Sequence, residues 1–314
     1  MKAYVMKKEK VILFEPWGLG DALIAFAIAL QDPTRISLAC NSKWHEVIQA
    51  SAHGMALPEL IGVNLQHRTR NHDQSHRKDA PPRISEPGIV LSIRGDVRDY
   101  FAARKIFPGS NIQMTGWVPF MAHHSALVDI PFANGWLPVL NRYKAWASIA
   151  SVKWAVIEEF YQQKRPMSDV RSIVVHVGAQ WRSKQFPHAA ELVNLLRDNY
   201  DVRVVAGLSD SLPDGIYEHD VCRLVNSDLV DVFKTSTYVI ANDSGPMHLA
   251  ALLHCRTIVV TNQAAMAAWL PPNVYSVESM GSPRGYKRRI IHPSDVISNG
   301  WPSPRDILNN FEVL

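Results

Sequence analysis

Cysteine is scarce in this sequence, and long apolar runs are missing. Only three cysteines occur in 314 residues, Cys40, Cys222 and Cys255, and no two of them form a C-x-x-C pair. The sequence therefore indicates neither a disulfide framework nor a thiolate zinc site, and we expect buried free thiols. No segment approaches the roughly 18 uninterrupted apolar residues of a membrane-spanning helix, and the first ten residues lack the apolar core of a secretory signal. We therefore expect a cytoplasmic protein.

The sequence also lacks the patterns that metal and nucleic-acid sites need. Asp96 and Asp99 are separated by two residues, so no paired Asp-x-Asp carboxylates are available to a divalent cation. We expect no metal and no cofactor. Basic residues gather in segments 67–83 and 284–289 without an interleaved aromatic platform, so nucleic acid is not an expected partner. At a net charge of +4, these segments fit either an anionic partner or a solvated surface.

Apolar runs of strand length alternate with helical segments in the first part of the sequence. The predicted strands are residues 11–14, 36–40 and 89–93, and the predicted helices are 22–30, 43–52 and 99–106. Two adjacent prolines and many polar residues favour a mobile loop over 67–88. The alternation indicates a parallel sheet covered by helices on both faces.

The same alternation restarts in the second half, after an aromatic-rich helical segment at 137–165. Strands are predicted at residues 172–178, 202–206, 238–241 and 256–260, and helices at 189–200, 229–236 and 246–253. We therefore expect an α/β chain with two doubly wound, Rossmann-like domains, 1–160 and 161–314, with the boundary near 150–168. Ligands of such sheets bind beyond the carboxyl ends of the strands.

One such strand end carries the sharpest pattern in the sequence, at residues 241–251. Pro246 stands where the first turn of a helix is expected, a position at which its missing N–H costs nothing. Ser244 and Gly245 would let a diphosphate approach the free N–H groups and the positive end of the helix dipole. Asp243 suits a hydroxyl partner or a helix cap, and His248 could donate to phosphate or fill a polar niche. The segment predicts an anion site, with a plain capped helix as the alternative.

Residues 243–251, Asp-Ser-Gly-Pro-Met-His-Leu-Ala-Ala, resemble the donor-binding signature of the heptosyltransferase family, glycosyltransferase family 9. Residues 18–21, Gly-Leu-Gly-Asp, are similar to the family's glycine-rich turn, and residues 91–100 to its strand with an Arg-Gly-Asp-x-Arg segment. Residues 176–187 resemble the first loop of the family's donor domain. Four such pieces in the correct order are more specific than any one alone.

The resemblance implies the GT-B fold, in which an N-terminal acceptor domain and a C-terminal nucleotide-sugar donor domain face across a cleft. It implies an inverting, metal-independent transferase that moves a heptose-like sugar from an ADP-heptose-like donor to an anionic glycan or glycolipid, such as lipopolysaccharide core. Such an acceptor fits a peripheral contact with the inner membrane, which the basic segments could make. The same basic segments would also be ordinary on an enzyme that makes no membrane contact.

The resemblance implies that Asp21 is the general base and that Lys184, with Arg182 beside it, neutralises the leaving diphosphate. From the residues alone, Asp21 could instead cap a helix beginning at Ala22, and the two cations could be an exposed loop. The donor-binding residues are predicted to be Arg182, Asp243, Ser244, Gly245, Pro246, Met247 and His248. The acceptor-binding residues are predicted to be Gly18, Gly20, Arg94, Asp96 and Arg98. For Trp17, Trp117 and Trp181, packing roles are favoured over sugar contacts.

Three other functions compete with glycosyl transfer. A nucleotide-sugar epimerase on the same architecture would need the same anion site but no acceptor. A non-catalytic nucleotide-sugar-binding module would keep the fold and dispense with Asp21. An NAD(P) dehydrogenase is disfavoured, because the turn at Gly18 and Gly20 lacks a third glycine and no acidic residue ends the strand at Cys40.

Overall fold

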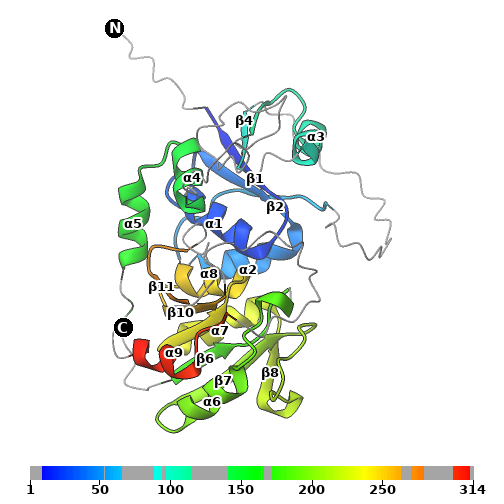
Figure 1. Cartoon of the computed structure of the whole chain (residues 1–314). Helices are drawn as coiled ribbons and strands as arrows, with labels where there is room; N and C mark the ends of the chain where they lie inside the picture. Colours follow the sequence, from blue (N-terminus) through cyan, green and yellow to red (C-terminus); the bar gives the residue numbers. More distant parts are fainter. Residues whose placement is uncertain are drawn as a thin grey trace, which may run out of the picture. The chain divides into compact units, whose positions relative to one another are not determined.

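The computed structural model of the protein describes residues 9–52, 54–65, 88–93, 97–114, 141–163, 165, 172–180, 182–262, 270–278 and 300–311. The chain divides into two compact units, residues 1–157 and 158–314 (Figure 1). Each unit holds one β-sheet, and every strand pairing within the described residues is parallel. The prediction of an α/β chain with parallel sheets is confirmed.

The sheet of unit 1 has the strand order β3-β2-β1-β4-β5. Its strands are β1 (Val11–Glu15), β2 (Ile36–Cys40), β3 (Leu60–Gly62), β4 (Ile89–Ser92) and β5 (Asn111–Met114). Its helices are α1 (Leu19–Ala29), α2 (His45–Ser51) with the short 3-10 turn η1 (Ser42–Trp44) before it, α3 (Val97–Ile106) and α4 (Arg142–Ile149). The strand order reverses between β1 and β4, which makes the carboxyl ends of these two strands the place where a ligand of this sheet is expected.

Helix α1 lies almost wholly in the interior of unit 1. Residues 22–29 are each no more than 1% exposed, because the helix packs against the sheet on one side and against α4 on another. On one face of the sheet, Ile12 and Phe14 of β1 pack against residues of α3 and Phe107, and the rings of Phe14 and Phe107 meet edge to face at 6.2 Å. Such burial fixes the carboxyl end of β1 and the turn that follows it.

The sheet of unit 2 has the strand order β11-β10-β9-β6-β7-β8. Its strands are β6 (Ser172–His176), β7 (Asp201–Gly207), β8 (Val221–Leu224), β9 (Tyr238–Asn242), β10 (Arg256–Thr261) and β11 (Val274–Glu278). Its helices are α6 (Ala189–Arg197), α7 (Asn226–Thr235), α8 (Gly245–Leu252) and α9 (Pro304–Phe311), with short 3-10 turns η3 (Arg182–Lys184) and η4 (Glu218–Asp220). Helix α5 (Trp154–Gln162) runs across the boundary between the units. The order is that of a Rossmann sheet, and it reverses between β6 and β9.

Several element boundaries differ from the sequence-based expectation. Helix α1 begins at Leu19 rather than at Ala22, so Gly20 and Asp21 lie inside its first turn. The helical segment predicted at 137–165 contains two helices, α4 and α5, separated near Ser151, whose φ of 56° cannot continue a helix. Strands β3, β5, β8 and β11 were not predicted, because runs of three to five residues leave too little periodicity to be recognised. Helix α9, of eight residues, was not predicted either. The predicted loop at 67–88 lies outside the described residues, except for its last position.

Candidate active site

The candidate active site begins at the carboxyl ends of β6 and β9, where the strand order of unit 2 reverses. His176 ends β6 and is paired in register with Ala241, so the loop after β6 and the turn after β9 leave the sheet side by side. The loop carries Arg182 and Lys184, and the turn carries Asp243 and Ser244. The two segments that were singled out from sequence therefore meet at one point.

Helix α8 starts at this point without a side-chain cap. Ser244 occupies the cap position in extended geometry, but its hydroxyl donates to the Asn242 carbonyl oxygen at 3.2 Å instead of accepting from the first helical turn. Pro246 lies in the first turn and brings no N–H of its own. The N–H of Met247 donates to the Ser244 carbonyl oxygen at 3.1 Å, so what this helix start offers to an anion is chiefly the positive end of its dipole. Met247 and His248 are buried in the same turn.

Lys184 brings a positive charge next to this helix start. Its Nζ donates to Oδ2 of Asp243 at 2.7 Å, and Asp243 directly precedes the cap residue Ser244. The Lys184 side chain is 30% exposed and that of Asp243 11%, so the pair is only partly shielded from solvent. Asp243 therefore holds the ammonium group in place rather than capping the helix, while Arg182 on the same 3-10 turn is exposed.

Asn242 holds the loop after β6 against the end of β9. Its Nδ2 donates to the carbonyl oxygens of Val177 and Gly178, both at 3.1 Å, and its Oδ1 accepts from the N–H of Phe186 at 3.0 Å. One buried side chain thus binds the loop on both sides of Lys184. No role was predicted for Asn242 from the sequence. A polar side chain at the end of a buried strand could have indicated one, because buried polar groups need hydrogen-bond partners.

A buried histidine and a carboxylate lie beneath the same loop. His176 is 3% exposed, and its Nδ1 has no hydrogen-bond partner among the residues that the structure describes. Burial lowers the pKa of His176 to about 4, although the negative charge of Asp210 and hydrogen bonding to the Gly178 backbone act in the opposite direction. Oδ2 of Asp210 accepts from the N–H of Gly207 at 2.9 Å, and it occupies the place that a side chain on Gly178 would take. This packing explains why residue 178 has no side chain.

In unit 1, Asp21 lies in the first turn of α1, directly after the end of β1. Gly18 is the cap residue of that helix and supplies no side-chain hydrogen bond. Its φ of −84° is open to any residue, but a Cβ at Gly18 would lie 3.1 Å from Oδ2 of Asp21. The glycine therefore makes room for the Asp21 carboxylate rather than for an unusual backbone conformation. Gly20 is the second residue of the same helix.

The turn before Gly18 is bonded to two other elements of unit 1. Nε1 of Trp17 donates to Oδ1 of Asp99 in the first turn of α3 at 2.9 Å, and Nε1 of Trp44 donates to the carbonyl oxygen of Trp17 at 3.1 Å. Asp99 is 0% exposed. The packing role expected of Trp17 thus includes two hydrogen bonds that the sequence could not indicate.

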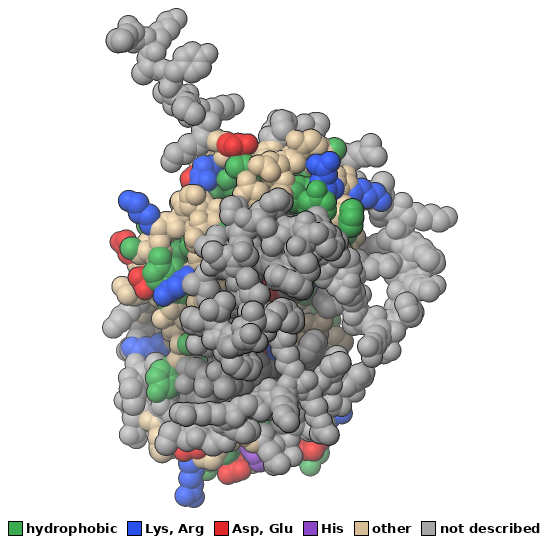
Figure 2. Space-filling model, turned by 45° about the horizontal axis from the view of Figure 1, so that its top comes forward, with side chains coloured by type: hydrophobic (Ala, Val, Ile, Leu, Met, Phe, Trp, Pro, Cys, Tyr) green, Lys and Arg blue, Asp and Glu red, His purple; other side chains and the backbone are tan. Residues whose placement is uncertain are grey.

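Part of the predicted site falls on residues that the structure does not describe. Arg94 and Asp96 lie outside the described residues, and for Arg98 only the backbone, in the first turn of α3, is described. Trp117, Trp181 and both basic segments also lie outside them. On the face drawn in Figure 2, the Lys and Arg side chains that are coloured are scattered singly rather than gathered in a patch.

In the described part of the chain, no three His, Cys, Asp or Glu side chains lie together as a metal ion would require. No helix there combines the length and the apolar character needed to cross a bilayer.

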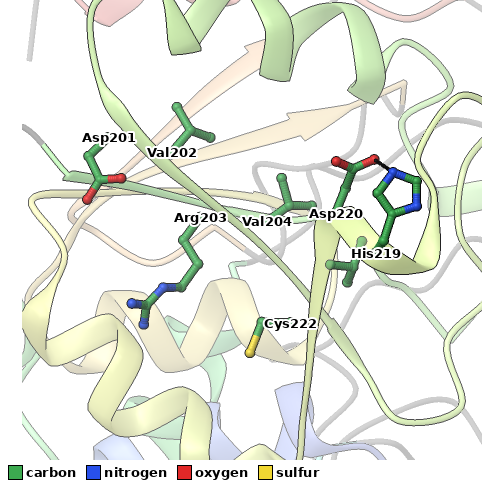
Figure 3. Close-up of a pocket in the computed structure, with 8 residues that line it drawn as sticks. Asp201, Val202, Arg203, Val204, His219, Asp220 and Cys222 are labelled. Carbon is green, nitrogen blue, oxygen red and sulfur yellow. Dashed lines mark ion pairs between the residues drawn. The ribbon is translucent and has the colours of Figure 1, made fainter.

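A cavity of about 380 Å³ lies at the opposite end of the unit 2 sheet, beside the first residues of β7 and β8 (Figure 3). His219 and Asp220 of η4 lie on one side of it, with Nε2 of His219 3.5 Å from Oδ2 of Asp220, and Arg203 of β7 lies on the other. Cys222 also lines it and is exposed, so the expectation of buried thiols is correct for Cys40 and Cys255 but wrong for this residue. The cavity lies at the amino ends of the strands and is separate from the candidate site.

Comparison with known proteins gives the same fold and family as the sequence motifs. The family model of glycosyltransferase family 9 (heptosyltransferase) matches residues 150–280. No curated protein sequence matches the chain.

Among solved structures, the Escherichia coli heptosyltransferase WaaC with ADP shares 16% sequence identity at a TM-score of 0.55, over 85% of this chain and 92% of that one. The E. coli ADP-heptose lps heptosyltransferase II shares 13% identity at a TM-score of 0.52, over 97% of this chain and 98% of that one. A family 9 glycosyl transferase from Veillonella parvula DSM 2008 shares 13% identity at a TM-score of 0.51, over 86% and 85%.

These likenesses confirm the predicted fold class, because the chain has the α/β architecture of the GT-B heptosyltransferase structures. The match over residues 150–280 spans β6 to β11 and so includes the loop of Lys184 and the start of α8. The resemblance inferred from the motifs is therefore confirmed over this part of the chain, where the sequence matches the heptosyltransferase model of glycosyltransferase family 9.

Proposed function

We propose that this chain is an inverting, metal-independent glycosyltransferase that moves a heptose-like sugar from a nucleotide-diphosphate donor to a glycan acceptor. The observation that carries the proposal is the Lys184 ammonium group, fixed 2.7 Å from Asp243 at the uncapped start of α8. A diphosphate at this helix start would meet the positive end of the α8 dipole and a fixed cation together.

The donor is proposed to be ADP-heptose or a close analogue. The E. coli heptosyltransferase WaaC, which has the same fold, has been solved with ADP and with ADP-2-deoxy-2-fluoro heptose. As the bond between the sugar and the diphosphate breaks, negative charge accumulates on the departing phosphate oxygen. Lys184 and the α8 start are arranged to stabilise that charge, with Arg182 exposed on the same turn as a second cation. These groups would supply the charge that a divalent metal supplies in other transferases.

The proposed general base is Asp21. Its carboxylate lies over Gly18 in the first turn of α1, at the carboxyl end of β1, where a ligand of the unit 1 sheet is expected. In the proposed step, Asp21 takes the proton of the acceptor hydroxyl while that oxygen attacks the anomeric carbon from the face opposite the diphosphate. One carbon–oxygen bond forms as the other breaks, so the configuration at the anomeric carbon inverts.

The acceptor is proposed to be an anionic glycan or glycolipid such as lipopolysaccharide core. Arg94, Asp96 and Arg98 follow β4 in the sequence, and β4 is the strand beside β1 in the sheet. We propose that these residues and the turn at Gly18 and Gly20 contact the acceptor. A peripheral contact with the cytoplasmic side of the inner membrane is part of the proposal, since such acceptors are lipid-linked.

Donor binding can be tested by thermal unfolding of the full chain with ADP, UDP, GDP and ADP-heptose. A ligand at 100 times its dissociation constant adds about 2.7 kcal/mol to the free energy of unfolding. Lys184→Met should weaken diphosphate binding about tenfold or more, whereas Lys153→Met, which removes an exposed lysine of unit 1, should leave it unchanged. Equal effects of the two substitutions, or no stabilisation by any nucleotide, would contradict the proposed donor site.

Transfer can be separated from the two competing functions by the fate of the donor. An epimerase would turn over ADP-heptose without acceptor, whereas the proposed transferase would release ADP in proportion to the glycan that it modifies. Asp21→Asn should lower kcat by about 100-fold or more and leave the Kd of the donor within twofold, because the base acts on the acceptor. If Asp21→Asn keeps full transfer activity, Asp21 is not the base. If the wild-type chain binds donor but never transfers sugar, the chain is a binding module.

A further inference from the structure

A hydrogen bond between side chains crosses the point in unit 1 where the strand order reverses. Trp17 follows β1 and Asp99 follows β4, and these two strands are neighbours in the sheet. Nε1 of Trp17 donates to Oδ1 of Asp99 at 2.9 Å, and the Asp99 carboxylate belongs to a residue with no exposed surface. An indole N–H bonded to a buried carboxylate is a strong and directional contact, since charge-assisted bonds exceed neutral ones.

The same tryptophan is held from a second side. Nε1 of Trp44, in the short turn η1 after β2, donates to the Trp17 carbonyl oxygen at 3.1 Å. The side chain of Trp17 is thus tied to α3 and its backbone to η1. The cap residue of the helix that follows is Gly18, which has no side chain to hold the turn.

The position of Asp21 depends on this turn. Its Oδ2 would lie 3.1 Å from a Cβ on Gly18, so the carboxylate rests directly against the residue that follows Trp17. Asp99 directly follows Arg98, the last of the three residues assigned to the acceptor. The bond from Trp17 to Asp99 therefore joins the turn before the proposed base to the first turn of α3.

We propose that Trp17 and Asp99 are positioning residues for sugar transfer, which hold the turn that carries the Asp21 carboxylate against the start of α3; this rests on the proposed function. Neither residue needs to touch the substrate. Misplacing a reacting group by about 1 Å can cost roughly 100-fold in rate, so a contact that fixes the turn acts on kcat. A bond that served the fold alone would change stability and leave turnover as it is.

The test compares two Trp→Phe substitutions in the full chain. Trp17→Phe removes the indole N–H and keeps an aromatic ring. Trp154→Phe makes the same change at an indole whose buried Nε1 has no partner within the described structure. We expect Trp17→Phe to lower kcat about tenfold or more with the donor KM within twofold of wild type, because the donor groups lie in unit 2. Trp154→Phe should stay within twofold in both. Equal kcat values for the two variants would overturn the proposal.

Asp99→Asn and Asp99→Leu separate the hydrogen bond from bulk packing. Asparagine keeps an oxygen that can accept from Trp17, so this variant should retain most of the turnover, whereas leucine offers no acceptor and should match Trp17→Phe. If the leucine variant turns over as fast as the asparagine variant, the acceptor at residue 99 has no positioning role. The pair also keeps the proposal testable should Trp17→Phe fail to fold.

Hydrogen exchange gives a readout that does not need transfer activity. The N–H of Ala22 donates to the Gly18 carbonyl oxygen at 3.0 Å and reports on the helix start. In Trp17→Phe this amide should exchange at least tenfold faster than in Trp154→Phe, and unchanged exchange would show that the bond does not hold the turn. A wild-type chain without transfer activity would overturn the proposed function, while the exchange comparison would still decide whether Trp17 fixes the turn.

Discussion

His176 is expected to make unit 2 sensitive to acid. It ends β6 within the sheet, 3% exposed, with an Nδ1 that has no partner. Desolvation lowers its pKa from 6.5 to about 4, and the nearby charge of Asp210 offsets only part of that effect. In the folded protein the imidazole therefore stays neutral at pH values at which an unfolded chain would protonate it.

The size and sign of the effect follow from proton linkage. Above pH 6.5 the imidazole is neutral in both states and pH has no effect through this residue. As the pH falls below 6.5, the unfolded state binds a proton that the folded state refuses, so the free energy of unfolding decreases by up to about 1.4 kcal/mol per pH unit. The decrease ends near pH 4, where folded His176 also takes its proton. The whole loss is about 3 kcal/mol.

The measurement is urea unfolding of the full chain from pH 7 to pH 4, followed by hydrogen exchange of amides in β6 and β7. His176→Gln removes the titrating group and keeps a polar side chain of similar length. Its stability should fall less steeply with acid, so that the difference from wild type changes by about 3 kcal/mol across this range. His219→Gln is the matched control, because the His219 side chain is 79% exposed. Parallel stability curves for wild type and His176→Gln would refute the linkage argument.

Three further substitutions probe the packing around the two turns. Gly178→Ala would set a Cβ 1.8 Å from Oδ2 of Asp210, so it should lower the free energy of unfolding of unit 2. Adding Asp210→Ala should restore part of that free energy, and additive effects of the two substitutions in urea unfolding would contradict this. Asn242→Asp replaces the donor to two carbonyl oxygens by an acceptor, which should lower the free energy of unfolding by about 2 kcal/mol or more. The same change should weaken ADP binding in calorimetry, and an unchanged Kd would show that this loop does not contribute to donor binding. Gly18→Ala keeps an allowed φ but crowds the Asp21 carboxylate, so kcat should fall with little change in Tm; full activity would show that the carboxylate tolerates the shift.

The most buried elements of the fold could be predicted, because burial requires runs of apolar or small residues that are visible in the sequence. Strand β2 was predicted with its observed bounds, Ile36–Cys40, since all five of its residues are buried and apolar or small. Strand β8 was not predicted, because its four residues are half-buried or exposed and show no alternation between a buried and an exposed face. Helix α1 was placed three residues late, since Gly20 and Asp21 are poor helix formers and only the packing of Leu19 shows where the helix begins.

For the candidate site, sequence spacing identified which segments matter but not how they connect. Pro246 and the glycine before it predicted the first turn of a helix, and α8 begins at Gly245. The pairing of Lys184 with Asp243 spans 59 residues of sequence and depends on β6 and β9 being neighbours. A strand order that places the first strand beside the fourth cannot be read from local periodicity. The bonds of Asn242 were hidden for the same reason.

In both units a polar side-chain bond crosses the place where the strand order reverses and holds the turn that the proposed function uses. In unit 1 the bond joins Trp17 after β1 to Asp99 after β4, and in unit 2 Lys184 after β6 is joined to Asp243 after β9. The groups that the two units hold in place carry opposite charges. Unit 1 holds the Asp21 carboxylate, which suits removal of a proton, and unit 2 holds a cation and a helix start, which suit a departing phosphate. Glycosyl transfer needs these two charges on different reactants, and a chain that carries one on each sheet can tune acceptor and donor binding by independent substitutions.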